Sequence, residues 1–489
     1  MSLVDQLEYM FNPKSVAVIG ASNTFGKWGF DMTNAVMATT ADRDVYPVNK
    51  KAPEICGLKA YESVKDVPDI VDFAVITVPP EQVPTVMNEC VNKGVKAAIV
   101  TSGGLGETSA DGARIEAEVV RIAKEGGLRF IGPNSMGHFN RSTDFYTCSW
   151  VPAVQKGNIG FISQSGNCGV HVTRCAADIG LGFSMFISSG NEADLHFEDY
   201  LEYLGQDDNT KVIIAYLEGL REGSRFVKLA KEITKKKPIV ILKAGGTPAG
   251  TNAARSHTAA LAGSDEVYNA MFRQCGVIRV NEMDELIDVA GALLHQPLPK
   301  SKRVGILSSG GGLGVLATDA CARQGLELVP LSEATMQKLN DILPSRWSHG
   351  NPIDTVAAFI TTFPCLWALL DDENVDAILM SGGASPSAIM PRLEGVSSST
   401  KEEIAQALSA RESEELSNWE LTFEHMDRLQ KPIILLQPVT ENFRNSQTFK
   451  MLQEKGFLFY PNPERAAKAL AHLMEYSEHV GVCRDGQSG

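Results

Sequence analysis

The sequence has no uninterrupted apolar run of the roughly 18 residues that a transmembrane helix requires. Its first residues, MSLVDQLEYMFNPKS, lack the basic segment and the apolar stretch of a signal peptide. The nine cysteines form no CxxC pair and no zinc-type spacing, so they are interpreted as small buried residues of a reduced compartment. We therefore expect a cytoplasmic protein with no membrane span and no metal site.

Positive charge is also scarce. The 45 Lys and Arg residues are outnumbered by 59 Asp and Glu residues, which gives a net charge of −14. This balance argues against a nucleic-acid-binding surface but leaves room for a local basic pocket that binds a phosphorylated ligand. With 489 residues, 44% of them hydrophobic and 21% charged, the chain is long enough for about two to four globular domains.

What the sequence does contain is a series of short apolar runs that end in glycine. The first run, Ser15–Gly20, is followed by a glycine-bearing turn and a helical stretch to about Met37. A strand, such a turn and a helix N-terminus form an anion-binding site, because free N–H groups and the helix dipole point toward the ligand. The spacing differs from GxGxxG, and that motif alone would be weak evidence.

The strand expected at Asp44–Val48 bears on the identity of the ligand. An NAD-binding domain usually has an acidic residue at the end of this strand, where it holds the ribose hydroxyls. Here the strand runs into Asn49, Lys50 and Lys51, which favour a ligand with an additional phosphate. Coenzyme A, with its 3′-phosphate, and NADP both satisfy that requirement.

Strands and helices alternate along the chain, which predicts parallel sheets wound by right-handed crossovers. Three α/β units are expected, with linkers near 151–156 and 295–300. Further strands are expected at 71–79, 95–101, 129–134, 159–163, 183–187, 211–217, 238–242 and 304–307. In the third unit a Pro/Ser-rich loop at 385–399 should precede a long charged helix over 401–429.

A long stretch of small residues, Lys243–Asp265, lies between the strand at 238–242 and a helix expected at Glu266–Cys275. Loops of about twenty residues without secondary structure are uncommon in compact domains unless they are functional or disordered. His257 is the only side chain on this loop that can act as a nucleophile near neutral pH. A lone histidine on a loop is more often incidental, so His257 gains weight only from its surroundings.

Glu218 is the candidate partner of this histidine. It follows the strand at 211–217, and ligands of parallel sheets bind beyond the carboxyl ends of the strands, so Glu218 and the loop should share one edge. An acidic residue at a strand end is, however, more often a helix cap. The strand ends at Ser163–Gly166 and Ser308–Gly312 repeat the glycine turn and predict two further anion-binding sites, although ordinary turn chemistry is the simpler account of any one such turn.

Together these motifs resemble those of the nucleoside-diphosphate-forming acyl-CoA synthetases, the superfamily of succinyl-CoA synthetase. The resemblance is strongest to the α subunits of the ADP-forming members. The stretches that carry it are 15–22, 47–49, 102–107, 132–134, 163–166, 190–194, 256–258, 260–265 and 310–319. Each is weak evidence by itself, but the set is specific.

The resemblance implies an α/β fold with three domains. These are an N-terminal Rossmann-like CoA-binding domain (1–150) and two flavodoxin-like doubly wound domains (151–298 and 299–480), of which the first bears a phosphohistidine loop. A disordered tail (481–489) is expected after them.

The resemblance also implies the roles of individual residues. His257 is expected to carry a phosphoryl group, received from an acyl phosphate or a nucleotide, and Glu218 to orient and stabilise it. The CoA thiolate then attacks the acyl phosphate to give the thioester. The phosphate-binding residues expected are Ser163, Gln164, Ser165, Gly166, Gly311 and Gly312. The CoA-binding residues expected are Gly20, Ser22, Asn23, Thr24, Phe25, Lys27, Asn49, Lys50, Pro79, Ser102, Gly103, Glu107 and Asn134.

The sequence departs from the family pattern in three respects. Ala259 replaces a glycine that is usual in the phosphohistidine loop, and Ser135-Met136 replaces a segment that often contains cysteine, which bears on acyl specificity. No stretch resembles the ATP-grasp domain that binds nucleotide and magnesium. We therefore expect ATP or ADP and Mg²⁺ to bind to a separate β subunit, in an αβ-type hetero-oligomer that uses CoA and a small carboxylic acid.

Two alternative functions remain open from the sequence. The first is a CoA-binding regulatory protein that has lost nucleotide chemistry, although such a module would need neither His257 nor Glu218. The second is an NADP-dependent oxidoreductase that uses only the first domain, which would leave the two later glycine-rich units without a role.

Overall fold

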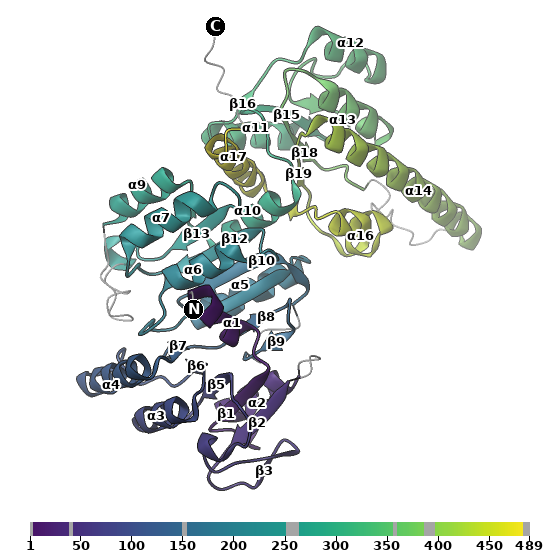
Figure 1. Ribbon diagram of the computed structural model, residues 1–489. Helices are drawn as coiled ribbons and strands as arrows, with labels where there is room; N and C mark the ends of the chain where they lie inside the picture. The colour runs from purple at the N-terminus through teal and green to yellow at the C-terminus, as the bar shows by residue number, and fades with distance from the viewer. Residues whose placement is uncertain are drawn as a thin grey trace. The chain divides into compact units, whose positions relative to one another are not determined.

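The structure is a computed structural model that describes residues 3–38, 43–148, 154–250, 264–355, 359–385 and 397–482. The chain forms two compact units, Met1–Leu286 and Ile287–Gly489. Figure 1 shows the elements of both units, and each unit is described by itself.

The first sheet of unit 1 consists of five parallel strands in the order β2-β1-β5-β6-β7. Its central strands are buried along their whole length, as expected where helices cover both faces of a parallel sheet. Helices α3 and α4 pack side by side (Figure 1). The strands are β1 (Ser15–Ile19), β2 (Asp44–Val48), β5 (Phe73–Ile76), β6 (Ala97–Val100) and β7 (Arg129–Ile131). The other elements are α1 (Leu3–Phe11), α2 (Trp28–Met37), the hairpin β3 (Glu54–Ile55) and β4 (Leu58–Lys59), η1 (Val64–Asp66), η2 (Pro80–Gln82), α3 (Val83–Lys93) and α4 (Ala110–Gly126).

The second sheet of unit 1 has seven strands in the order β14-β13-β12-β10-β11-β8-β9. Its five parallel strands are β10 (Lys156–Ser163), β11 (Phe183–Ser188), β12 (Val212–Leu217), β13 (Ile239–Lys243) and β14 (Ile278–Val280). The helices of this part are α5 (Gly166–Asp178), α6 (Phe197–Gln206), α7 (Gly223–Ile233) and α9 (Asp265–Cys275). Helices α6 and α7 pack together beside strands β10, β12 and β13 (Figure 1).

An antiparallel hairpin completes this second sheet. Strands β8 (His138–Asn140) and β9 (Phe145–Tyr146) pair with each other, and β8 pairs with β11. The hairpin lies within the range 1–150 that the sequence suggests for the first domain, yet its hydrogen bonds place it in the second sheet. His138 is a structural residue of this hairpin, because burial lowers its pKa to about 4 and its Nε2 is 3.0 Å from the carbonyl oxygen of Met10 in α1.

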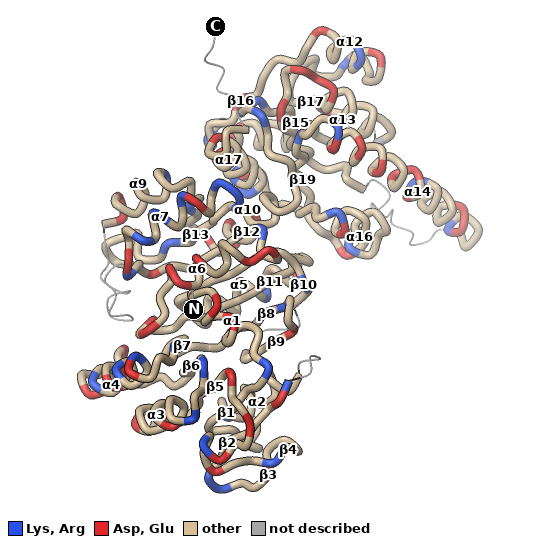
Figure 2. Tube along the Cα trace, in the orientation of Figure 1, with Lys and Arg blue, Asp and Glu red and all other residues tan. Residues whose placement is uncertain are grey.

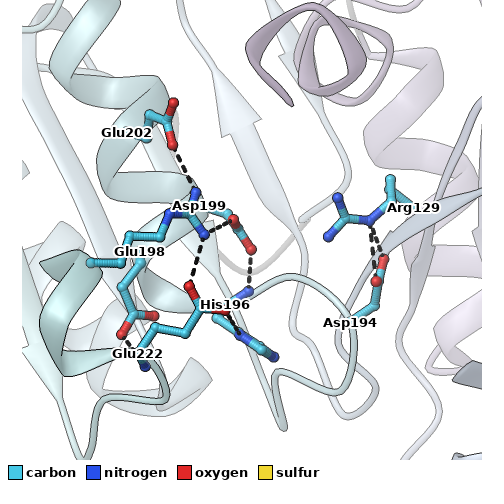
Figure 3. Close-up of polar contacts among 8 residues, drawn as sticks. Arg129, Asp194, His196, Glu198, Asp199, Glu202 and Glu222 are labelled. Atoms are coloured by element: carbon cyan, nitrogen blue, oxygen red, sulfur yellow. Dashed lines mark hydrogen bonds and ion pairs between the residues drawn. The ribbon is translucent and has the colours of Figure 1, made fainter. Parts of the chain in front are cut away.

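The first and second sheets are joined by the loop that follows β11. The Asn191 N–H donates to the carbonyl of Pro133 (2.9 Å), and the Ala193 N–H donates to the carbonyl of Gly132 (3.0 Å). Asp194, which is nearly buried, accepts hydrogen bonds from Arg129 Nε and from the N–H of the next residue, Phe130 (both 2.9 Å). Figure 3 shows this ion pair beside the cluster formed by His196, Asp199 and Glu222. The loop at 190–194 is therefore fixed to the last strand of the first sheet and to the turn after it.

Unit 2 contains a third parallel sheet of six strands in the order β16-β15-β18-β19-β20, with β17 beside β15. Its core includes the fully buried Trp419, whose indole N–H donates to the Ala384 carbonyl (2.9 Å). The strands are β15 (Arg303–Ser308), β16 (Glu327–Leu328), β17 (Ile353–Asp354), β18 (Ala377–Ser381), β19 (Ile433–Leu436) and β20 (Phe459–Tyr460). The helices are α10 (Met283–His295), which spans the boundary between the units in sequence, α11 (Gly311–Arg323), α12 (Glu333–Ile342), η3 (Phe359–Thr361), α13 (Thr362–Asp371), α14 (Ser398–Leu429), α15 (Glu441–Asn445), α16 (Gln447–Glu454) and α17 (Pro463–His479).

These observations confirm the predicted α/β class with parallel sheets. The helix expected at Glu266–Cys275 is α9, and the long charged helix is α14. Basic and acidic residues are interleaved along α4 (Figure 2). Within the described parts of the chain, no helix combines the length and apolar character needed to cross a bilayer. Most of the expected tail, 483–489, lies outside the described residues.

Candidate functional site

The predicted CoA-binding residues gather at one edge of the first sheet. Because its five strands are parallel, their carboxyl ends meet at the same edge, where ligands of such sheets bind. The expected residues follow β1, β2, β5, β6 and β7 in turn. They are Gly20, Ser22, Asn23, Thr24, Phe25 and Lys27 after β1, Asn49 and Lys50 after β2, Pro79 after β5, Ser102, Gly103 and Glu107 after β6, and Asn134 after β7. The topology thus brings together residues that are far apart in sequence.

The turn after β1 has no room for a side chain at two glycines, Gly20 and Gly29, where the backbone packs closely against neighbouring segments. Gly20 has a φ of +93°, and a Cβ there would lie 2.7 Å from Thr77 Oγ1. A Cβ on Gly29 would lie 1.9 Å from the Gly20 carbonyl oxygen, so α2 packs directly against the turn. No side chain caps the N-terminus of α2 at Lys27, and Phe25 is 85% exposed. The backbone is therefore open to close approach by an anion.

Two predicted CoA-binding asparagines stabilise this turn. Asn49 donates from Nδ2 to the Ala21 carbonyl (2.8 Å) and accepts at Oδ1 from the N–H groups of Lys51 and Ala52. Asn23 likewise links the turn to the β3–β4 hairpin. Their amides hold the loops, whereas the Lys50 side chain is exposed beyond β2.

The end of β10 and the start of α5 form the first predicted phosphate site. Ser163 Oγ donates to the carbonyl of Ser165 (2.5 Å), and Ser165 Oγ accepts from the Cys168 N–H as the N-cap of α5 (3.4 Å). Gln164 Oε1 accepts from the N–H groups of Glu218 (2.5 Å) and Gly219 (3.0 Å). Gln164 therefore ties the β12 end to the helix N-terminus instead of presenting a free amide.

Glu218 lies at this edge, directly after β12. It is 9% exposed, and its Oε2 has no hydrogen-bond partner among the described residues. Burial, reinforced by the charge of Glu218, raises the pKa of the neighbouring Tyr216. Lys243, at the end of β13, donates from Nζ to the Glu218 carbonyl (2.8 Å) and lies 4.6 Å from the centre of the Tyr268 ring. The backbone of Glu218 is thus held in place by hydrogen bonds with Gln164 and Lys243.

The loop that bears His257 begins and ends at the same edge. The Ala244 N–H, at its start, donates to the Leu217 carbonyl (2.9 Å), directly beside Glu218. Asp265, at its end, forms an ion pair with Arg279 (2.6 Å). His257 itself belongs to residues 251–263, outside the residues that the structure describes.

A small cavity of about 50 Å³ lies where this edge meets the first sheet. It is lined by Gly106, Glu107, Glu116, Gln164, Gly190, Asn191, Glu192, Glu218, Gly219 and Arg221. Asn191 Nδ2 donates to Glu107 Oε2 (2.6 Å), which connects the predicted CoA loop to the second sheet. The cavity has room for a group of a few heavy atoms, such as a phosphoryl group.

Sequence reasoning missed several residues of this cavity, among them three with polar side chains. Asn191, Glu192 and Arg221 were not expected in the site, although the stretch 190–194 carries part of the family resemblance. Arg221 Nη2 donates to the Asn191 carbonyl (3.3 Å), so the two strand-end loops contact each other. Two features of the sequence could have predicted a role for 190–194 in the site, namely the family resemblance and its position after a buried strand.

The second predicted phosphate site, in unit 2, repeats the local design of the first. Ser308 Oγ donates to the Gly310 carbonyl (2.7 Å), as Ser163 does to Ser165. Gly310 is the N-cap of α11 and provides no side-chain cap, and a Cβ on Gly312 would meet no atom within 4 Å. The N-terminus of α11 therefore has no side-chain cap at Gly310, and the carboxylate of Asp354, at the end of β17, lies beside Gly311.

Comparison with known proteins agrees with this geometry. Residues 14–141 match the family described as CoA binding domain, and residues 156–293 match the succinyl-CoA ligase like flavodoxin domain. The α subunit of acetate–CoA ligase (ADP-forming) II from Pyrococcus furiosus is 38% identical over 477 residues, which cover 97% of this chain and 99% of the relative.

Two solved structures are similar over nearly the full length. Dinucleotide-forming acetyl-coenzyme A synthetase 1 of Ca. Korarchaeum cryptofilum, solved with phosphate and ADP, is 31% identical with a TM-score of 0.83, covering 99% of both chains. A Pyrococcus horikoshii protein is 35% identical with a TM-score of 0.79, covering 97% of this chain and 100% of that one. These full-length matches, which agree with the sheet edges and the cavity, show that the chain belongs to the ADP-forming acyl-CoA ligase family. Within that family it is similar to the α subunits.

Proposed function

We propose that this chain is the α subunit of an ADP-forming acyl-CoA ligase, which interconverts acyl-CoA, ADP and phosphate with a carboxylic acid, CoA and ATP. One observation carries this proposal. Glu218, the N-terminus of α5 and both ends of the His257 loop converge at one sheet edge, beside the predicted CoA loop Ser102–Glu107. We infer that this edge brings the proposed nucleophile His257, its orienting acid Glu218 and an anion site to the expected thioester.

The edge of the first sheet suits CoA. The turn after β1 leads into α2, which has no side-chain cap at Lys27, and a helix N-terminus favours a negatively charged group such as a pyrophosphate. The exposed Lys50 after β2 suits the 3′-phosphate, because a lysine ammonium pairs with phosphate as a compact charge. These residues fit CoA better than NAD, which would require an acid at the end of β2.

The chemistry on this chain would proceed in two steps. A phosphate oxygen attacks the thioester carbonyl, and the CoA sulfur leaves with the proton of the phosphate, which gives an acyl phosphate. An imidazole nitrogen of His257 then attacks phosphorus, and the carboxylic acid leaves as its carboxylate. Glu218 holds the proton on the other imidazole nitrogen, so that the attacking nitrogen keeps its lone pair.

The N-terminus of α5 would stabilise the product of the second step. Phosphohistidine carries about two negative charges, and a helix N-terminus contributes on the order of 1 kcal/mol to a partly buried anion. Ser165 and Gly166 present their backbone at this position. The opposite reaction, acyl-CoA synthesis, uses the same contacts in reverse order.

The nucleotide half of the reaction requires a partner. We expect a separate ATP-grasp β subunit that binds ADP or ATP with Mg²⁺ and exchanges the phosphoryl group with His257 in an αβ-type hetero-oligomer. The 38% identical Pyrococcus furiosus relative is named as a subunit alpha, which supports a separate partner.

The experiment that tests this function measures ATP formation from acetyl-CoA, phosphate and ADP with Mg²⁺, using the purified chain together with a candidate β subunit. We expect turnover with the unaltered chain, and we expect His257→Ala to abolish it because the phosphoryl carrier is lost. The same variant should bind CoA within a few-fold of the unaltered chain, because His257 is not among the predicted CoA contacts.

Titrations with CoA and with NADPH provide the control for ligand class, and only CoA should saturate. Retained turnover in His257→Ala, or loss of its CoA binding, would contradict the proposal. Saturable binding of NADPH in place of CoA would favour an oxidoreductase.

A further inference from the structure

Glu192 lies in the loop after β11 with a combination of features that the reaction above does not use. It is 3% exposed and lines the same cavity as Glu218 and Gln164. Its Oε1 accepts a hydrogen bond from Ser189 Oγ (2.7 Å), whereas its Oε2 has no partner of hydrogen-bond geometry among the described residues. A buried polar atom without a protein partner is uncommon, so Oε2 has hydrogen-bonding capacity left for a bound group.

The backbone at Glu192 is also strained. Its φ of +55° lies in the left-handed region, which is unfavourable for a non-glycine residue. The neighbouring residues Asn191 and Ala193 hold this conformation through their hydrogen bonds to Pro133 and Gly132. The loop is therefore constrained in a conformation that places Glu192 in the lining of the cavity.

The surroundings of Glu192 favour its neutral form. Burial raises its pKa to about 7, and the charge of Glu198 on α6 acts in the same direction. Hydrogen bonding from Ser189, from the Gln164 side chain and from the Phe197 backbone acts against it. Tyr200, also on α6, is a further titratable neighbour of the carboxyl group. The other charged residues that line the cavity are Glu107, Glu116, Glu218 and Arg221.

We propose that Glu192 is part of the phosphoryl-binding site, where it binds as the neutral acid and donates a hydrogen bond from Oε2 to an oxygen of the phosphoryl group. An ionised Glu192 would add a fourth carboxylate to a cavity that contains one arginine, and it would repel a dianion. A neutral carboxylic acid in a buried site is instead a strong donor. The inference rests on the function proposed above and extends it to the substrate phosphate.

The test uses sulfate as the probe, because sulfate stays a dianion across the neutral range whereas phosphate itself titrates there. Calorimetry measures sulfate binding at about pH 6 and about pH 8.5 to the full-length chain with His257→Ala, so that the imidazole does not contribute. In that chain we expect affinity to fall about tenfold as pH rises, because Glu192 loses its proton. With Glu192→Gln added, the amide remains a donor at both pH values and affinity should change less than about twofold.

Glu198→Gln is the matched control. Glu198 is also fully buried with an unpartnered Oε2 among the described residues, but it does not line the cavity. That variant should keep a pH dependence of sulfate binding, with its midpoint moved to lower pH because the charge of Glu198 no longer raises the pKa of Glu192. Proton uptake gives a second readout that needs no substitution at Glu192. It is measured by calorimetry of sulfate binding in two buffers of different ionisation enthalpy. We expect up to about one proton to be taken up with sulfate at pH 8.5 and almost none at pH 6.

Three results would each overturn the inference: the same pH dependence with and without the Glu192→Gln change, absence of proton uptake, or absence of sulfate binding at the lower pH. These measurements report anion binding and not turnover. If they succeed while the unaltered chain with its partner forms no ATP, only the proposed function fails. If turnover is found while the pH dependence survives Glu192→Gln, only the role of Glu192 fails.

Discussion

The N-termini of α5 and α11 are built in the same way but have different surroundings. In both, a buried serine at the strand end, Ser163 or Ser308, donates to the carbonyl two residues later, and a glycine opens the helix. This shared device explains why the two turns look alike in sequence. Local structure alone would therefore assign both the same function.

The differences arise from other elements. At α5, Gly166 packs against Met136, Gln164 binds the backbone of Glu218, and Glu192 approaches from the loop after β11. At α11, the cap has no side chain, and the helix exposes Leu313, Val315 and Leu316 by 44%, 61% and 52%. Both turns have an acid of a neighbouring strand end beside them, Glu218 at α5 and Asp354 at α11, so the contrast between them lies in the additional contacts from Met136, Gln164 and Glu192 at α5.

The largest effect that separates the two turns is expected from Glu218→Gln. The variant keeps the shape of the residue but lacks the negative charge with which Glu218 is proposed to hold the proton on the imidazole. Phosphorylation of His257 should therefore slow by about 100-fold, which corresponds to about 2.7 kcal/mol of activation barrier. The measurement is the rate of phosphoryl incorporation from acetyl-CoA and phosphate. Glu232→Gln, an exposed change on α7, is the control and should leave the rate unaltered; an equal effect of both would contradict the role of Glu218.

A somewhat smaller effect concerns stability at the α5 site. Because Glu192 has a raised pKa of about 7 in the folded protein, the folded state binds more protons than the unfolded state between about pH 4.3 and 7. Stability should therefore fall as pH rises through that window, and Glu192→Gln should remove the loss. We expect the variant to be more stable by on the order of 1–3 kcal/mol at pH 8, with the gain shrinking toward pH 5 in thermal unfolding. A gain that is constant with pH would show that Glu192 is not the titrating group.

The smallest contrast compares the two helix N-termini directly. A Cβ at Gly166 would lie 2.4 Å from Met136 Cγ, whereas a Cβ at Gly312 would meet nothing within 4 Å. Gly166→Ala should therefore destabilise the protein by about 1–2 kcal/mol and weaken phosphate binding at α5. Gly312→Ala should leave the free energy of unfolding within about 0.5 kcal/mol. Calorimetric unfolding checks both, and similar losses would mean that the α11 turn is as tightly packed as the α5 turn.

Much of the fold could be predicted from local pattern. Apolar runs that end in glycine, such as Ser15–Gly20, mark buried parallel strands, and their topology places Glu218 at the edge from which the His257 loop starts. The hairpin β8–β9 was not predictable, because its place in the sheet depends on antiparallel pairing with β11, which follows more than forty residues later in the chain.

The sequence suggests a candidate nucleophile and a candidate acid, which stay predictions, but it does not reveal their supporting contacts. The amide of Gln164 is occupied by the backbone after β12, and Asn49 is occupied by the turn after β1, which only tertiary structure reveals. Glu192 escaped notice because its burial and left-handed backbone depend on contacts with the turn at 132–134. Residues whose environment depends on such distant contacts cannot be identified from the local hydrophobic pattern of the sequence.

The phosphorylation state of the chain itself decides whether His257 is a phosphoryl carrier. The purified protein would be incubated with acetyl-CoA and phosphate, and separately with ATP and Mg²⁺, alone and with a candidate β subunit, before intact-mass and peptide analysis. We expect an acid-labile gain of about 80 Da, one phosphoryl group, on His257, absent from His257→Ala, and dependent on the β subunit when ATP is the donor. No gain under any of these conditions would contradict the proposed function and favour a CoA-binding protein without catalysis.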